Sequence, residues 1–529
     1  MSHRNLCRAA CLAALAFALP ALAGAQTVWT ATSGSWFDAG NWTSGVPDGS
    51  ADARIDNTGT AEVAATGAAA HSVLLGFAAT DAGTLQVDSS ATLDVAADLA
   101  VGYGGNGMLA IGGGAIVNDY SGEIGYTIAS ESGVHGDATV DGAGSQWNHA
   151  FELYVGYGVG TLAITNGASV HDVYGYLGYF PESPGHSSGT ATIDGAGSIW
   201  THDASLHIGD SGTGVVTVSN GGSLVNGEGD LGFNFSSDGT ATVTGAQSSW
   251  TTYGFFYVGN NGNGTLSVED GGTVSSLGGF GYMSWASAST STATIDGPGS
   301  SWTNANGFYV GFGGTATLSI TNGGSMQNGT FANVGFSPGA SGTVHVSGAG
   351  SVFGTGGALS IGGNVSGPGG AGALQVDDGG AISASAVNIW NTGTLALDGA
   401  ANIAAATVSV DAPLGVGAGG ATIDGDLVLT SASSTTMTVA AASGGLAVSG
   451  NASLGGSLTL DLDAALVAGR YTLLEAGGGL GGSTFATVAV TPPADMTATV
   501  TYDDTHAYVV LAPTVPDDLL FRDGFDGAP

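Results

Sequence analysis

The chain has 529 residues, with 42 Asp and Glu against five Lys and Arg, so its formal net charge is −37. Such a chain lacks the basic surface that would neutralise nucleic-acid phosphates or an anionic membrane, and we expect neither partner. Its 96 glycines argue against an all-helical fold, because glycine costs about 1 kcal/mol per helical position relative to alanine. An apolar fraction of 43% is enough for a folded core.

The first 25 residues are typical of an export signal. Basic residues precede a short apolar run at residues 11–19, and the small residues at 21–25 fit a signal-peptidase site. The run is shorter than the about 20 apolar residues that span a bilayer. We therefore predict a signal peptide over 1–25 and no membrane insertion. The only cysteines, Cys7 and Cys11, lie in this segment, so the mature protein has no disulfide.

Residues 26–60 contain three tryptophans, Trp29, Trp36 and Trp42, and lack the pattern that follows them. The first unit of a repeat array presents unpaired strand edges, and these must be covered. We expect residues 26–60 to be an N-terminal cap.

The next segment, residues 61–400, repeats about every 51 residues. Each unit ends on a phrase such as DGAGSQW or DGAGSIW, and the final aromatic residues follow one another at steps of 53, 50, 52 and 51 positions. These markers are Trp147, Trp200, Trp250, Trp302 and Phe353. A period this regular over so long a segment indicates an array of equivalent structural units.

Each unit divides into two similar halves of about 25 residues, in which short strands of alternating polarity are separated by Gly, Asn and Asp. These residues accept the left-handed backbone of tight corners. A chain that turns three corners and then repeats forms one coil of a solenoid, with coils about 4.8 Å apart. We predict an all-β, right-handed parallel β-helix (β-solenoid), in preference to a propeller, whose four-stranded blades favour longer strands.

The solenoid predicts which side chains face outward. In the Leu153-Tyr154-Val155 segment, alternate residues face opposite sides of the strand, and the outer two stay apolar in all five copies. We therefore expect Leu153 and Val155 in the core and an outward column with one residue from every second coil. This column contains Tyr154, His207, Tyr257, Tyr309 and Ser360. The Trp series forms a second column, whose direction the sequence leaves open.

The repeat fades after about residue 400. Residues 401–513 are rich in Ala, Val and Gly, and we expect a C-terminal β extension that continues and caps the solenoid. Regular strands are predicted over residues 469–475 and over the TATVTYDDTHAYVVL segment. The acidic tail, residues 514–529, is a candidate sorting or anchoring signal.

The phrases GTATIDGAGSIWT and LYVGYGVGTLAITNGASV, with their copies over about residues 100–380, resemble the repeat shared by autotransporter (T5SS) passengers and PEP-CTERM surface proteins. WTATSGSWFDAGNW and AGRYTLLEAGGGLGGSTFATV are similar to the opening and closing segments of such passengers. The resemblance implies a β-helical surface or secreted protein, often adhesive, with no catalytic motif. The chain departs from both families because it shows neither a translocator barrel nor a hydrophobic helix followed by basic residues. Its ending, DDLLFRDGFDG, looks instead like a short tail of some exported proteobacterial proteins.

A secreted β-helical polysaccharide lyase or glycoside hydrolase is the alternative function. A lyase of this type needs a cationic base, and the repeat body contains no Lys or Arg. A hydrolase needs two carboxylates about 5 to 10 Å apart. Asp141, Asp194 and Asp296 are candidates by type, but each has the same turn position in its repeat and is interpreted as a corner residue. We predict no catalytic residue.

The histidines suggest a metal site through His202 with His207 or His171 with His186, but neither spacing matches a known ligand motif. We predict no metal site and no cofactor beyond diffuse calcium binding to the acidic surface. His207 replaces a tyrosine in the outward column and is interpreted as a surface position.

The binding candidates are Tyr154, Tyr257 and Tyr309 of the outward column. These rings could stack on the sugars of a glycan, or stack on one another and shield the sheet; we favour the second interpretation. The predicted function is that of a non-enzymatic adhesin or structural spacer, secreted or held at the cell surface. Its expected partners are surface glycans or the surface of a host or neighbouring cell.

Overall fold

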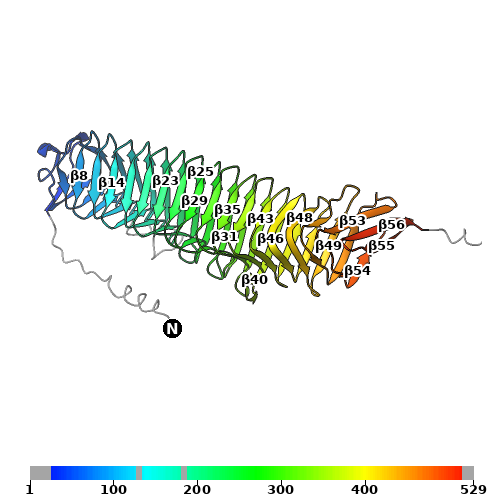
Figure 1. Ribbon diagram of the computed structural model, residues 1–529. Helices are drawn as coiled ribbons and strands as arrows, with labels where there is room; N and C mark the ends of the chain where they lie inside the picture. Colours follow the sequence, from blue (N-terminus) through cyan, green and yellow to red (C-terminus); the bar gives the residue numbers. More distant parts are fainter. Residues whose placement is uncertain (1–24, 127–133, 180–186, 515–529) are drawn as a thin grey trace, which may run out of the picture.

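The computed structural model describes residues 25–126, 134–179 and 187–514 and contains a β-solenoid of about 18 turns (Figure 1). The predicted all-β parallel β-helix is confirmed, because strands of successive coils pair in parallel. The helical content of the described residues is one short 3-10 turn, Ala39–Asn41. Apart from Ala25 and Thr514, the predicted signal peptide and acidic tail lie outside the described residues.

Each coil of the repeat region contributes one strand to each of three faces. Face 1 has the longest strands, and the shorter strands of faces 2 and 3 follow it along the chain. The face 1 strands are β10 (Asn106–Ile111), β13 (His135–Asp141), β16 (Val159–Thr165), β19 (Ser188–Asp194), β22 (Thr213–Ser219), β25 (Asp238–Thr244), β28 (Asn263–Glu269), β31 (Thr290–Asp296), β34 (Thr315–Thr321) and β37 (Ser341–Ser347). The face 2 strands are β11 (Ile116–Asp119), β14 (Gln146–His149), β17 (Ser169–Asp172), β20 (Ile199–His202), β23 (Ser223–Asn226), β26 (Ser249–Thr252), β29 (Thr273–Ser276), β32 (Ser301–Asn304), β35 (Ser325–Asn328) and β38 (Val352–Thr355). The face 3 strands are β12 (Ser121–Ile124), β15 (Glu152–Val155), β18 (Tyr174–Leu177), β21 (Ser205–Ile208), β24 (Glu228–Leu231), β27 (Phe256–Val258), β30 (Gly281–Met283), β33 (Phe308–Val310), β36 (Ala332–Val334) and β39 (Ala358–Ile361).

The core runs along the axis of the solenoid and is filled from all three faces. Leu153 and Val155 are fully buried, as predicted. The Trp series points inward from face 2: its four tryptophans are 0% exposed and Phe353 is 1% exposed. Bulky rings lie next to glycines of the adjacent coil, as where Phe256 packs at Gly229. Burial of each large apolar side chain contributes about 1.5–3 kcal/mol.

The corners after face 1 are held by hydrogen bonds between coils. Asn166, Asn220 and Asn322 turn the chain with φ values of 54°, 52° and 54°, the left-handed backbone predicted for these corners. Ser198 is buried at such a corner, where its hydroxyl donates to the carbonyl of Asp194 at 2.7 Å and accepts from a backbone N–H of the preceding coil at 3.0 Å.

The N-terminal end is covered by a tryptophan cluster. Trp42 makes edge-to-face contacts with Trp29 and Trp36 at ring-centroid distances of 4.9 Å, and all three rings are buried. In the same segment, β1 (Ala25–Val28) pairs in parallel with β3 (Ala51–Ile55). Residues 26–60 therefore contribute strands to the first coil as well as rings that cover it.

The C-terminal end changes pairing direction. Strands β53 (Gly469–Ala476), β55 (Met496–Tyr502) and β56 (His506–Pro513) form an antiparallel sheet at the red end of the rod (Figure 1). These elements agree with the strands predicted there from the sequence. In the portion of the chain that the structure describes, no helix has the length and apolar character needed to cross a membrane.

Candidate functional site

The outer side of face 3 carries a continuous column of large and polar side chains, which we call the strand column. Parallel pairing places the middle residue of each face 3 strand over its equivalent in the next coil. In chain order the column contains Glu123, Tyr154, Tyr176, His207, Asp230, Tyr257, Tyr282, Tyr309, Asn333 and Ser360. The predicted column is confirmed at every second coil, and the intervening coils fill the positions between.

A second column covers the first, and we call it the corner column. At most coils a glycine with positive φ follows the face 3 strand, for example Gly156 at 76° and Gly209 at 71°, and it turns the next side chain back over the sheet. The corner column contains Tyr103, Tyr126, Tyr157, Tyr179, Asp210, Phe233, Asn260, Trp285, Phe312 and Phe336. Contacts such as Tyr154 with Tyr157 and Tyr282 with Trp285 join the two columns.

The three predicted binding tyrosines lie outside the core, but a second layer of side chains covers them. Tyr257 is only 6% exposed, because aromatic side chains from the corners pack over it. Tyr154 stacks on Tyr176 at 5.0 Å, and Tyr282 stacks between Tyr257 and Tyr309 at 5.1 Å to each. Tyr257 thus faces away from the core, as predicted, but other side chains cover it, and the expected stacking of rings within the column is confirmed.

Stacking along the rod determines what these tyrosines offer to a ligand. The ring planes of Tyr257, Tyr282 and Tyr309 differ by 11° and 5°, so neighbouring rings occupy the faces that a sugar would need. A ligand could reach ring edges and hydroxyl groups only. Burial raises the pKa of Tyr154 strongly, with its hydrogen bond to Glu152 adding to the effect, and burial raises that of Tyr309 to about 12. Both hydroxyls therefore stay protonated; that of Tyr154 donates to Glu152, and that of Tyr309 can donate to a ligand.

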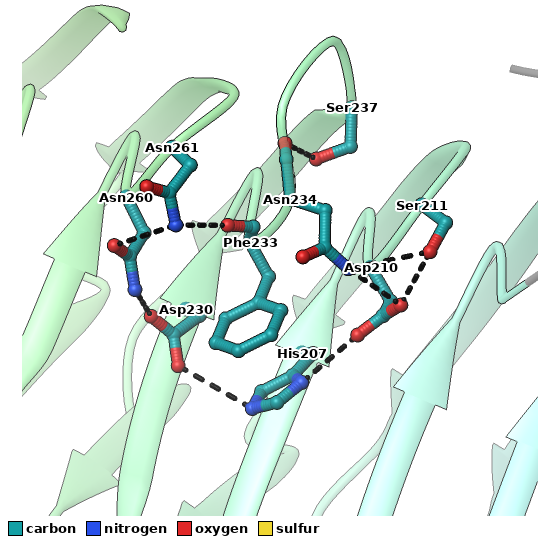
Figure 2. A network of polar contacts seen from close by, with 9 residues as sticks. All are labelled: His207, Asp210, Ser211, Asp230, Phe233, Asn234, Ser237, Asn260 and Asn261. Carbon is teal, nitrogen blue, oxygen red and sulfur yellow. Dashed lines mark hydrogen bonds and ion pairs between the residues drawn. The ribbon is translucent and has the colours of Figure 1, made fainter. Parts of the chain in front are cut away.

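A polar break at His207 separates the two aromatic stretches (Figure 2). Nδ1 of His207 lies 3.0 Å from Oδ1 of Asp210, and Nε2 lies 3.6 Å from Oδ2 of Asp230. The side chains of these residues are 12%, 4% and 0% exposed. Phe233 stacks on the imidazole at 3.8 Å and covers it. The prediction that His207 is a surface position is therefore wrong, since the corner column buries it between two carboxyl groups.

Amide side chains complete the network around the two carboxyl groups (Figure 2). Asn260 donates to Oδ1 of Asp230 at 2.7 Å, and Asn234 donates to Oδ2 of Asp210 at 3.2 Å. Oδ2 of Asp230 is buried without a hydrogen-bond partner, and His207 is its nearest ionic neighbour. The negative charge of an ionised Asp230 would therefore be poorly stabilised by its neighbours.

Burial controls the protonation of this network. It raises the pKa of Asp230 from 3.8 to about 7, against the lowering effects of His207 and Asn260. Burial alone would lower the pKa of His207, but the hydrogen bond to Asp210 and the charges of Asp230, Asp210 and Glu228 raise it overall. The group thus changes its proton content near neutral pH.

An acidic cluster lies at the N-terminal end of the strand column. Burial raises the pKa of Glu123 to about 8, and the nearby charges of Asp98 and Glu152 act in the same direction. Tyr154 donates to Oε2 of Glu152 at 2.6 Å. This cluster was not predicted, because its residues come from successive coils and share no sequence motif.

Two histidines are buried inside the solenoid. Trp147 and His149 both contact the carboxylate of Asp119, and Trp200 and His202 contact that of Asp172 in the same way. The repeated Trp-x-His spacing in QWNH and IWTH is the sequence signal for this pair. His202 therefore points into the core, whereas His207 lies outside it.

The residues considered for metal binding and catalysis have other partners. His202 points into the core from face 2, His207 lies on the outer side of face 3, and His186 lies outside the described residues. In the ranges described, no group of three or more His, Asp or Glu is arranged to hold a metal ion. The carboxylates of Asp141, Asp194 and Asp296 each accept hydrogen bonds from the corner of the next coil, at distances of 2.5 to 2.6 Å.

Comparisons with known proteins add little to this description. No family model and no curated protein matches the chain. Among solved structures it is similar to a TibC-catalysed, hyper-glycosylated TibA fragment, with 18% sequence identity and a TM-score of 0.36. The match covers 65% of this chain and 97% of that fragment. A likeness at this level carries no argument about function, which must come from the chain's own residues.

Proposed function

We propose that the chain is an exported, non-enzymatic β-helical surface protein that acts as an adhesin or a structural spacer. The observation that carries the proposal is the stack of about 18 coils in one rod (Figure 1). At about 4.8 Å per coil the stack extends roughly 90 Å. A rod of this length presents its outer faces well away from the point at which it is attached.

The charge of the chain fits this function. A net charge of −37 makes rods repel one another, which favours separate molecules at a surface or in the medium. Salt or calcium would screen the repulsion within a Debye length of about 8 Å at physiological ionic strength. We propose diffuse calcium binding of this kind, without a dedicated site.

The proposed absence of catalysis is supported by how the candidate groups are used. Asp141, Asp194 and Asp296 join neighbouring coils at equivalent corners, about two or four coils apart. The His207 network is covered by Phe233. Glycans are the proposed partners, contacted through the ring edges of Tyr154 and Tyr309 and through the hydroxyl group of Tyr309.

Three experiments test the proposal. Fractionation of cells that express the full chain should place it at the surface or in the medium, and recovery only from the cytosol would overturn export. Deletion of residues 514–529 tests whether the tail anchors the protein. An anchored protein would be released into the medium by the deletion, whereas a simply secreted protein would be found in the medium with or without the tail. Purified protein should bind members of a panel of acidic and neutral glycans without shortening them; chain shortening would support the lyase or hydrolase alternative.

A further inference from the structure

Face 1 carries two rows of side chains over seven consecutive coils, from β19 to β37, and all but Val215 and His345 are hydroxyl residues. The rows are formed by the outward residues at the third and fifth positions of each strand, and the strands pair without a register shift. The first row contains Thr190, Val215, Thr240, Thr265, Thr292, Thr317 and Thr343, and the second contains Thr192, Thr217, Thr242, Ser267, Thr294, Ser319 and His345. We call these rows the hydroxyl array.

The hydroxyl groups of the array are available to a ligand. Across the residues that the structure describes, its threonine hydroxyls have no hydrogen-bond partner in the protein, and Ser267 makes one bond, to Glu269 at 3.2 Å. Thr265 and Thr292 are exposed, and their neighbours are partly exposed. Because threonine is branched at Cβ, its χ1 is restricted and each residue holds its methyl and hydroxyl groups in few orientations.

The spacing of the array is that of a two-dimensional lattice. Equivalent hydroxyls of successive coils are about 4.8 Å apart, and the two rows are separated by two strand residues, about 6.6 Å. Only a partner that is itself periodic at these distances can contact all positions at once. A globular protein has no such period on its surface. A second copy of this solenoid has it, but both copies carry a net charge of −37 and repel each other.

The chemistry of the array further limits the class of partner that it can bind. Apart from His345 at one end, the two rows contain no titratable group, in a chain whose net charge is −37. They also contain no aromatic ring of the kind that stacks on sugars. The β propensity of threonine favours it in any exposed strand. Face 2 also has outward hydroxyl pairs, in the three coils of β26, β29 and β32. Its rows are interrupted on both sides of this run by Val225 and Gln327, so face 1 has the longer array.

We propose that the hydroxyl array of face 1 is an ice-binding surface. Ice is an uncharged solid whose water oxygens repeat in two directions at distances close to the two spacings of the array. Hydroxyl groups held at these positions would replace lattice waters, while the methyl groups between them exclude liquid water. This activity does not rest on the proposed surface location, since a secreted rod would carry the same face.

The test compares full-length variants on two faces. The first combines Thr265→Lys with Thr292→Lys, which places long charged side chains in the array. The matched control combines Thr251→Lys with Thr303→Lys, at outward positions of β26 and β32 on face 2. Each protein is assayed for partition into slowly growing ice and for inhibition of ice recrystallisation, and circular dichroism confirms that the variants are folded.

The wild type and the face 2 variant should enter the ice and inhibit recrystallisation, and the face 1 variant should lose most of both activities. Wild-type protein that enters ice no better than an unrelated acidic protein would overturn the proposal. Equal losses on both faces would also overturn it. Binding to crystalline cellulose in place of ice, lost in the face 1 variant, would assign the array to a polysaccharide and refute ice binding.

Discussion

Replacement of Asp230 by asparagine should stabilise the middle of the solenoid, and more so as the pH rises. Burial raises the pKa of Asp230 from 3.8 to about 7. Because the pKa of Asp230 is higher in the folded state than in the unfolded state, a rising pH favours unfolding. The contribution of this group to the free energy of unfolding is fully present below pH 3.8 and is lost as the pH rises to 7. At about 1.4 kcal/mol per pH unit, the loss is roughly 4 kcal/mol above neutral pH. His207, whose pKa is also raised, loses stability in the same direction.

The amide of Asp230→Asn keeps the acceptor for Asn260 and adds a donor that can face Nε2 of His207, but it cannot ionise. The variant should therefore lack most of the loss above pH 7, and by pH 5 its advantage over the wild type should shrink to about 40% of that value. Because a solenoid opens locally rather than as one unit, hydrogen exchange of the amides in β21, β24 and β27 measures this quantity best. Exchange rates are corrected for the intrinsic effect of pH.

The matched control is Asp461→Asn on β52 (Ser457–Leu462), an exposed carboxylate in a distant coil. It should leave exchange in β21, β24 and β27 unchanged at every pH. If Asp230→Asn had the same pH dependence as the wild type, or opened these strands more readily at pH 8, the argument that a buried carboxylate limits their stability would be refuted.

Three further outcomes follow from the packing and charge. Trp250→Ala removes a fully buried ring that donates to Asn226 and should cost about 3–5 kcal/mol, measured by local hydrogen exchange or protease cleavage; protection equal to the wild type would contradict the core assignment. Simultaneous Tyr154→Ser, Tyr257→Ser and Tyr309→Ser should abolish glycan-array binding, and binding that survives would remove these residues as a site. Added salt or millimolar calcium should make the second virial coefficient, measured by light scattering, less positive; no change would exclude charge repulsion.

The strand column was only partly predicted, because the sequence repeat was read with a period of about 51 residues. With a step of about 51 residues, the sequence places Tyr154, Tyr257 and Tyr309 in one column but omits the coils between them. The half-repeat phrases GYLGY, GDLGF and GYMSW contain the missing members, Tyr176, Asp230 and Tyr282, and the aromatic residues that cover them. A step of about 25 residues would have predicted the complete column.

The sequence alone determined the coil, because a period of about 25 residues, alternating polarity and Asn-Gly corners are local properties that any β-solenoid must have. Only the tertiary structure decided the direction of the tryptophans and the burial of His207. The direction of the tryptophans depends on which residues of the face 2 strands point to the core. The burial of His207 depends on its neighbours in the adjacent coil and on a glycine with positive φ that turns the corner residue back over the sheet. Stacking between coils joins residues far apart in the chain, so the environment of each charge arises only when the coils are assembled.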